Sequence, residues 1–210
     1  MRTSIRQYED DRGNVINTTL VINEAFIDFK GKNNKVYIHS NAKIRNLSIV
    51  FAGDNGVVNI GSGGEVKLSI RVGYDATISI GNGLTCTSTC YITAVEGGVI
   101  EIGDDCMFAS ANELRSDDGH PIFDLVTGDR INFGGSIKVG NHVWLGARSV
   151  ILGTASIENG CVIGHSAVVK SNIPANCIAV GVPAKVVRKN IRWERPHLSL
   201  NKNYKIQSNF

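Results

Sequence analysis

The chain has 210 residues, enough for one domain with a sizeable core, and it is 42% hydrophobic but only 7% aromatic. The net charge of +3 is too small to indicate nucleic-acid binding, and five cysteines without a Cys-x-x-Cys pair argue against a disulfide framework or a zinc ribbon. The N-terminus lacks an apolar signal-like segment, and no stretch approaches the ~20 apolar residues of a membrane span, so we expect a cytoplasmic protein.

Aliphatic segments in the first half of the chain indicate the coils of a repeat fold. Early examples lie around Val21, 36–38 and 44–50. From residue 58 an aliphatic-x-aliphatic-Gly motif recurs at 58–61, 78–81, 100–103 and 137–140. The motif glycines stand 20, 22 and 37 residues apart. The first two steps fit one coil of roughly eighteen residues with small corner bulges, whereas the third requires a loop that leaves the coil.

This inserted loop is predicted over residues 109–133 and is the first candidate for chemistry. It is polar, and long loops on rigid scaffolds tend to carry function. Its only histidine, His120, is flanked by Asp117, Asp118 and Asp124. A carboxylate beside an imidazole fixes its tautomer and raises its basicity, so His120 is a candidate general base. The alternative is a solvated loop histidine.

A register of six follows the loop and predicts the fold class. Aliphatic residues occupy every sixth position at Val139, Leu145, Ile151, Ile157, Ile163 and Val169. Small or β-branched residues follow the first five after four positions, at Val143, Ser149, Ala155, Cys161 and Ala167. An amphipathic helix would need a different spacing, and hairpin turn signals are missing. The period predicts an all-β, prism-shaped parallel β-helix with three hexapeptides in each coil.

The register ends near residue 172, which divides the chain into a β-helix domain, 1–172, and a C-terminal cap with a basic tail, 173–210. A cap is expected because an open coil would expose unpaired strand edges. Beyond residue 184 the chain contains one acidic residue, Glu194, and seven basic residues: Lys185, Arg188, Lys189, Arg192, Arg195, Lys202 and Lys205. This run is either a solvated tail or a surface for an anionic ligand such as cofactor phosphates.

Four segments together resemble the left-handed parallel β-helix acyltransferases. They are the hexapeptide register, Ser116-Asp117-Asp118-Gly119-His120-Pro121, Val143-Trp144-Leu145-Gly146 and Gly181-Val182-Pro183-Ala184-Lys185-Val186-Val187-Arg188. The resemblance covers residues 58–188. Within this family, the chain most resembles the capsular polysialic acid O-acetyltransferases of encapsulated bacteria. The family's usual Asn-Pro-Ala-Lys is Val182-Pro183-Ala184-Lys185 here, which puts one side-chain contact in doubt.

The resemblance implies an acetyl-CoA-dependent O-acetyltransferase that modifies a saccharide hydroxyl, on sialic acid residues of capsular polysaccharide. His120 would deprotonate this hydroxyl for direct attack on the thioester, without an acyl-enzyme. Asp118 is the flanking carboxylate expected to assist it. Trp144 would lie beside the thioester, where its indole N–H, or a backbone N–H nearby, is a candidate oxyanion donor. Alternatively, Trp144 only forms a wall of the acceptor pocket.

The resemblance also implies the donor site and the assembly. The pantetheine group of CoA would contact backbone groups at turn positions that correspond to Gly146, Ala147 and Ser166. Candidate phosphate partners are Arg148, Lys170, Lys185 and Arg188. Because the family's sites lie between subunits, a homotrimer is expected. No metal is expected.

Three alternatives stay open at this level. The acceptor could be a small sugar or nucleotide sugar. A zinc carbonic anhydrase on the same prism needs three histidines, but His39, His120, His142, His165 and His197 form no close pair. A non-enzymatic β-helix scaffold would need neither the polar insertion nor a tryptophan at a turn.

Overall fold

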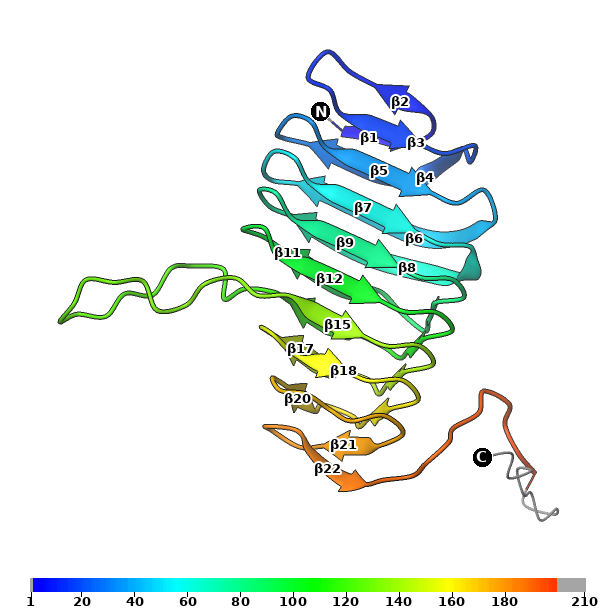
Figure 1. Ribbon diagram of the computed structural model, residues 1–210. Helices are drawn as coiled ribbons and strands as arrows, with labels where there is room; N and C mark the ends of the chain where they lie inside the picture. The colour runs from blue at the N-terminus through cyan, green and yellow to red at the C-terminus, as the bar shows by residue number, and fades with distance from the viewer. Residues whose placement is uncertain (1, 200–210) are drawn as a thin grey trace.

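The computed structural model describes residues 2–199 as a solenoid of stacked coils (Figure 1). Within this range the strands form a 14-stranded and an 8-stranded sheet, and no helix is present. The larger sheet bends along β8, whose beginning pairs with β10 and whose remainder pairs with β11, so the coils present three faces. The expected all-β parallel β-helix of hexapeptide repeats is confirmed. No helix in the described part of the chain is long and apolar enough to cross a membrane.

Each face is a column of strands, one from each successive coil. Face A contains β1 (Arg2–Ile5), β4 (Ile22–Phe29), β6 (Ala42–Phe51), most of β8 (Gly63–Val72), β11 (Cys90–Ala94), β14 (Glu113–Arg115), β17 (Val150–Leu152) and β20 (Val168–Val169). Face B contains β2 (Tyr8–Glu9), β3 (Val15–Asn17), β5 (Lys35–Ile38), β7 (Val57–Ile60), β9 (Thr77–Ile80), β12 (Val99–Ile102), β15 (Ile137–Val139) and β18 (Ser156–Ile157). Face C contains the start of β8, β10 (Thr85–Cys86), β13 (Met107–Phe108), β16 (Trp144–Leu145), β19 (Val162–Ile163), β21 (Ile178–Val180) and β22 (Lys185–Arg188).

The core is the column of aliphatic side chains that the period of six predicted. The four glycine-containing motifs stack on face B, where Ile78, Ile100 and Ile137 are direct partners in parallel strands. From Val139 to Val169, the six aliphatic residues of the register are at most 1% exposed. A buried side chain of this kind contributes about 1.5–3 kcal/mol to folding. The early coils are also confirmed, because β5 and β6 contain the segments 36–38 and 44–50.

Antiparallel strands cover both ends of the solenoid. β1 pairs antiparallel with β4, and β22 pairs antiparallel with β21. Parallel stacking continues past residue 172, because β21 pairs with β19 and Ile173 forms a bridge with Ile157. Coil-like pairing therefore extends into the segment expected to be the cap. Of the basic tail, Lys202 and Lys205 lie outside the described residues.

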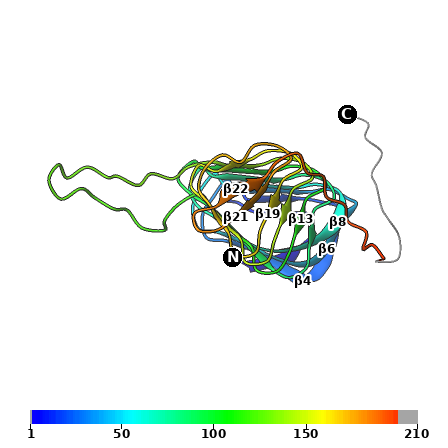
Figure 2. The ribbon, with the colours of Figure 1, turned by 90° about the horizontal axis from the view of Figure 1, so that it is seen from below.

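Two segments leave the solenoid on opposite sides (Figure 2). One is the inserted loop between β14 and β15, and the other follows β22. The expected loop range, 109–133, begins too early, because residues 113–115 form β14 in register with β11 and β17. The projecting part, hereafter the arm, is residues 117–134. Its base is closed by a hydrogen bond from Gly135 N to Ser116 O, 2.7 Å long.

Candidate active site

His120 lies in the arm and is held through its backbone. The arm folds back on itself, with Ile131 N donating to Ile122 O at 2.9 Å. Asn132 ties the two sides together: its Nδ2 donates to His120 O at 2.9 Å and to Asp118 Oδ2 at 3.0 Å. Its Oδ1 accepts a hydrogen bond from Ile122 N at 2.6 Å. The arm therefore presents His120 near its base on a fixed backbone, with an exposed side chain.

A cavity of about 310 Å³ separates this part of the arm from the corner after face A. His120, Asp117 and Pro121 line it from the arm. The solenoid contributes polar, charged and small residues: Ala52, Arg71, Gly73, Tyr74, Thr93, Val95, Glu96 and Arg115. Gly119 and Arg130 complete the arm's side. A concave site with one imidazole and three guanidinium groups is suited to an anionic molecule that carries a hydroxyl group.

The three arginines of the cavity differ in how far they are neutralised. Arg130 forms a two-point ion pair with Glu96, with N–O distances of 3.0 and 2.9 Å. Hydrogen bonding from Arg130 lowers the pKa of Glu96, so this carboxylate stays ionised. Arg115 pairs with Glu113 at 3.1 Å, while Arg71 pairs with no carboxylate of residues 2–199. Arg71 is therefore the arginine of this cavity that forms no ion pair with a described carboxylate, although the carboxylate of Asp117 also lines the cavity.

The aspartates around His120 take separate positions. Asp118 accepts from Asn132, as described above, and no hydrogen bond or ion pair joins it to the His120 ring. Asp117 Oδ1 accepts from Gly119 N at 2.6 Å, while its Oδ2 is buried without a hydrogen-bond partner among the described residues. Asp124 caps the tip of the arm by accepting from Val126 N and Thr127 N, both at 2.8 Å. That Asp118 assists His120 stays a prediction.

Trp144 lies on face C, away from this cavity. Its side chain points outward from β16, is 37% exposed, and stands between Met107 and Val162 of the neighbouring strands. The ring of Trp193, from the segment after β22, lies 6.0 Å from its own. That segment and the arm leave opposite sides of the solenoid (Figure 2). A single copy therefore does not bring Trp144 and His120 together.

Four of the seven predicted donor-site residues meet at the corner between faces C and A. Gly146, Ala147 and Arg148 form one turn, and Ser166 N donates to Ala147 O at 2.9 Å from the next coil. Ser166 Oγ accepts from Arg148 Nε at 3.4 Å, and the guanidinium also contacts His165 Nε2. Of the other three candidates, Lys170 follows β20 on face A, and Lys185 and Arg188 are the ends of β22, where Lys185 pairs with Val180.

Sequence reasoning did not single out Arg71, Arg115 or Arg130 as site residues. Arg71, Thr93 and Arg115 are direct partners in successive face A strands, 22 residues apart each time. The motif glycines at 81 and 103 have that same spacing, so the coil length could have predicted this alignment. All five cysteines are buried and unpaired, and none lines the cavity. Among residues 2–199, no group of three or more His, Cys, Asp or Glu residues is arranged to hold a metal ion.

Comparisons with known proteins agree with this architecture. Residues 136–171 match the model of the bacterial transferase hexapeptide family (six repeats). The chain is 39% identical over 188 residues to a polysialic acid O-acetyltransferase of Neisseria meningitidis, covering 86% of this chain and 84% of that one. The crystal structure of the polySia-specific acetyltransferase NeuO is similar with a TM-score of 0.83 and 33% identity, over 90% of this chain and 88% of that one. The polysialic acid O-acetyltransferase OatWY gives a TM-score of 0.73 and 32% identity, over 89% and 90%. The chain therefore belongs to the hexapeptide-repeat O-acetyltransferases, the family that includes these polysialic acid O-acetyltransferases.

Proposed function

We propose that this O-acetyltransferase moves an acetyl group from acetyl-CoA to a hydroxyl group of sialic acid residues in a capsular polysaccharide. The observation that carries the proposal is the cavity in which His120 faces Arg71 and Arg115. Each residue of a sialic acid polymer carries a carboxylate beside several hydroxyl groups. A guanidinium binds a carboxylate through two parallel hydrogen bonds, so an arginine can position the sugar while the imidazole receives a hydroxyl proton.

The reaction then needs one base and no covalent enzyme intermediate. His120 takes the proton of the acceptor hydroxyl as its oxygen attacks the thioester carbonyl. The C–O bond forms, the C–S bond breaks, and the protonated His120 returns the proton to the leaving thiolate. The buried positions of the five cysteines fit a mechanism without a thiol nucleophile.

The proposal includes a homotrimer with sites between copies. His120 and Trp144 lie on different sides of one chain, so a site that uses both needs two copies. The arm also exposes apolar side chains, and Leu125 and Val126 are 101% and 94% exposed. Exposed apolar groups that gather on a projecting hairpin are typical of an interaction surface. The arm of one copy would bring His120 to face C of its neighbour, beside Trp144.

The proposed donor site is the corner of Gly146, Ala147, Arg148 and Ser166. Backbone groups at turns can hydrogen-bond the amides of pantetheine, and Arg148 offers a cation for a phosphate. Acetyl-CoA is a cytoplasmic metabolite, and five unpaired cysteines fit a reducing compartment. We therefore place the reaction in the cytoplasm.

The experiment that tests the acceptor is transfer of label from radioactive acetyl-CoA. Polysialic acid, the same polymer with its carboxylates reduced to alcohols, and a panel of neutral sugars are compared as acceptors. We expect labelled polysialic acid, with much weaker labelling of the reduced polymer. Equal labelling of both polymers would contradict recognition of the carboxylate. Label in a simple sugar alone would contradict the proposed acceptor and favour a small sugar.

A variant of Arg71 links this result to the cavity. Replacing Arg71 with Ala removes a charge-assisted hydrogen-bond donor, which is worth about 1.5–3 kcal/mol. We expect the KM for polysialic acid to rise by about tenfold or more, with the KM for acetyl-CoA unchanged. Lys138→Ala is the control, because it removes one exposed cation from face B, outside the cavity. Equal effects of both variants would indicate long-range charge attraction instead of a carboxylate site.

A further inference from the structure

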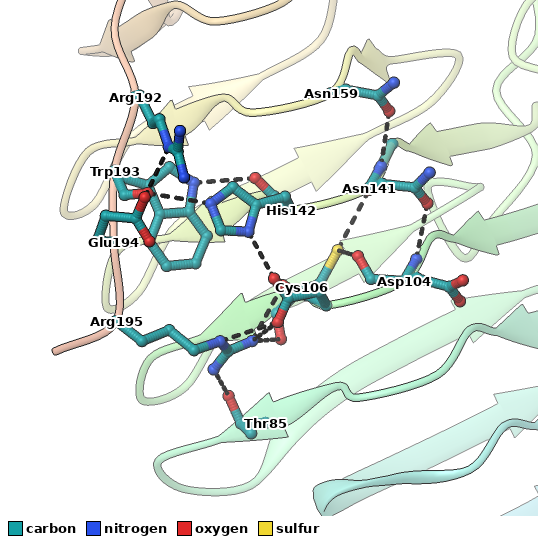
Figure 3. Close-up of polar contacts among 12 residues, drawn as sticks. Thr85, Asp104, Cys106, Asn141, His142, Asn159, Arg192, Trp193, Glu194 and Arg195 are labelled. Atoms are coloured by element: carbon teal, nitrogen blue, oxygen red, sulfur yellow. Dashed lines mark hydrogen bonds and ion pairs between the residues drawn. The ribbon is translucent and has the colours of Figure 1, made fainter. Parts of the chain in front are cut away.

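A short segment after β22 returns to the solenoid and lies along the edge of face C (Figure 3). We call this segment, residues 191–195, the strap. It begins where Ile191 N donates to Asn176 O at 3.0 Å. Although the strap has no regular secondary structure, Trp193 is only 7% exposed. A buried tryptophan in an irregular segment needs specific contacts, since its indole N–H requires an acceptor.

His142, at the corner before face C, holds Trp193 through both ring and backbone. The two rings stack with centroids 4.0 Å apart and planes 10° from parallel. Trp193 Nε1 donates to His142 O at 2.9 Å, and His142 Nε2 lies 3.0 Å from Trp193 O. The other ring nitrogen, Nδ1, lies 2.6 Å from Asp105 Oδ2. Carbonyl and carboxylate oxygens are both acceptors, so both contacts are hydrogen bonds only when each ring nitrogen carries a proton.

Arg195 fixes the far end of the strap to two earlier coils. Its Nε donates to Asp105 Oδ1 at 2.9 Å, and one terminal nitrogen donates to Thr85 Oγ1 at 2.8 Å. The other terminal nitrogen donates to the carbonyl oxygens of Asp105 and Cys106 at 3.0 and 3.1 Å. The same guanidinium lies 5.8 Å from the centre of the Trp193 ring. Together with the stacking on His142, these bonds determine where the Trp193 ring lies.

The ring held in this way lies beside Trp144. Their centroids are 6.0 Å apart and their planes are tilted by 49°, while Trp144 is 37% exposed. A partly exposed side chain on a flat strand face has several rotamers available, and a fixed neighbour restricts them. We infer that Trp193 is a positioning residue that sets the orientation of the Trp144 indole at the donor side of the active site. This inference rests on the proposed function, in which Trp144 lies beside the thioester.

A double-mutant cycle tests whether Trp193 acts through Trp144. Trp193→Ala should lower kcat by about tenfold with little change in the KM for acetyl-CoA, because a displacement of ~1 Å in a positioned group can cost up to 10²-fold. Trp193→Phe keeps a ring against His142 and should recover most of the activity. In a Trp144→Phe background, Trp193→Ala should have no further effect on kcat. Glu194→Gln is the control, because Glu194 is an exposed strap residue whose described ion pair is with Arg192.

A strap that only covers the edge of face C predicts a different result. Trp193→Ala would then lower the melting temperature and leave the kcat of folded enzyme unchanged, or lower kcat equally in both backgrounds. Either result would overturn the inference. If Trp193→Ala does not fold, Arg195→Gln provides the same test, because it removes bonds that hold the strap while both tryptophans remain in the chain.

Circular dichroism separates failure of this inference from failure of the proposed function. The chain has two tryptophans, Trp144 and Trp193, and indoles this close give a coupled pair of bands in the far ultraviolet. Trp144→Phe and Trp193→Phe should each remove that signal. Its absence from the wild-type enzyme would overturn the inference directly. If the signal is present but polysialic acid receives no label from acetyl-CoA, the proposed function fails while the contact between the rings stands.

Discussion

The arm and the strap are both departures from the repeat, but they relate to the solenoid in opposite ways. The arm holds its own shape through backbone contacts and Asn132, and at its tip Leu125 is fully exposed. The strap has no hairpin of its own, yet hydrogen bonds to two earlier coils leave Trp193 only 7% exposed. The strap completes a face of its own chain, whereas the apolar tip of the arm is left for another molecule to cover. In the proposals made above, the strap positions a group within the subunit, whereas the arm carries a group to a neighbour.

The largest expected effect is the loss of kcat when the imidazole of His120, on the arm, is removed. His120→Ala removes the proposed general base and should lower kcat by at least ~100-fold, with assembly and the KM for acetyl-CoA nearly intact. Steady-state kinetics with saturating polysialic acid would measure it. His197→Ala is the matched control, because His197 is an exposed histidine beyond the strap. Near-normal turnover of the His120 variant would leave the arm without a catalytic role.

A smaller effect is expected at the apolar tip of the arm. Replacing Leu125 and Val126 with Asp puts two charges on a surface that the proposal buries between copies, which is costly unless the charges are paired. We expect the assembly to dissociate and activity to fall by about tenfold or more, while the melting temperature of the solenoid changes little. Analytical ultracentrifugation would measure the assembly. Val21→Asp is the control, since Val21 is also exposed, at 72%, but lies outside the arm. A wild-type enzyme that is monomeric and fully active would contradict the proposal.

The repeat was predictable from sequence because its signal is periodic. Positions such as Leu145 and Ile151 face the same core at a fixed spacing, so both the fold and the strand column of face B followed from counting. The step of 37 residues between two motif glycines also predicted that a loop leaves the coil. The start of the arm was placed too early because β14 is short and carries no motif glycine.

The alignment of the cavity arginines could have followed from the coil length, but the return of the strap could not. Arg71 and Arg115 lie near each other because their coils are stacked, with Thr93 between them. All three positions precede residue 139, where the register of six begins. Trp193 contacts His142, 51 residues earlier, and Arg195 contacts Asp105, 90 residues earlier. No local pattern encodes a contact that depends on where a non-repeating tail returns. His120 could be singled out as a candidate from sequence because its flanking aspartates lie on the same arm, and its role stays a prediction.

The smallest expected effect concerns the charged contacts of the strap. Burial tends to raise the pKa of Asp105, but the hydrogen bond from His142 and the charge of Arg195 outweigh it and lower this pKa below its usual value near 3.8. The contacts of Asp105 with His142 and Arg195 therefore stabilise the fold at pH values above about 3.8. Their contribution is lost as the pH falls through the lowered pKa of Asp105 in the folded state. Because the Asp105 side chain is 55% exposed, we expect Asp105→Asn to reduce the free energy of unfolding at pH 7 by only a few tenths of a kcal/mol. Urea unfolding at pH 7 and pH 3 would measure this, and the difference between variant and wild type should narrow at pH 3. A difference that persists unchanged at pH 3 would mean that the stacking of Trp193 on His142, and not the charge of Asp105, fixes the strap.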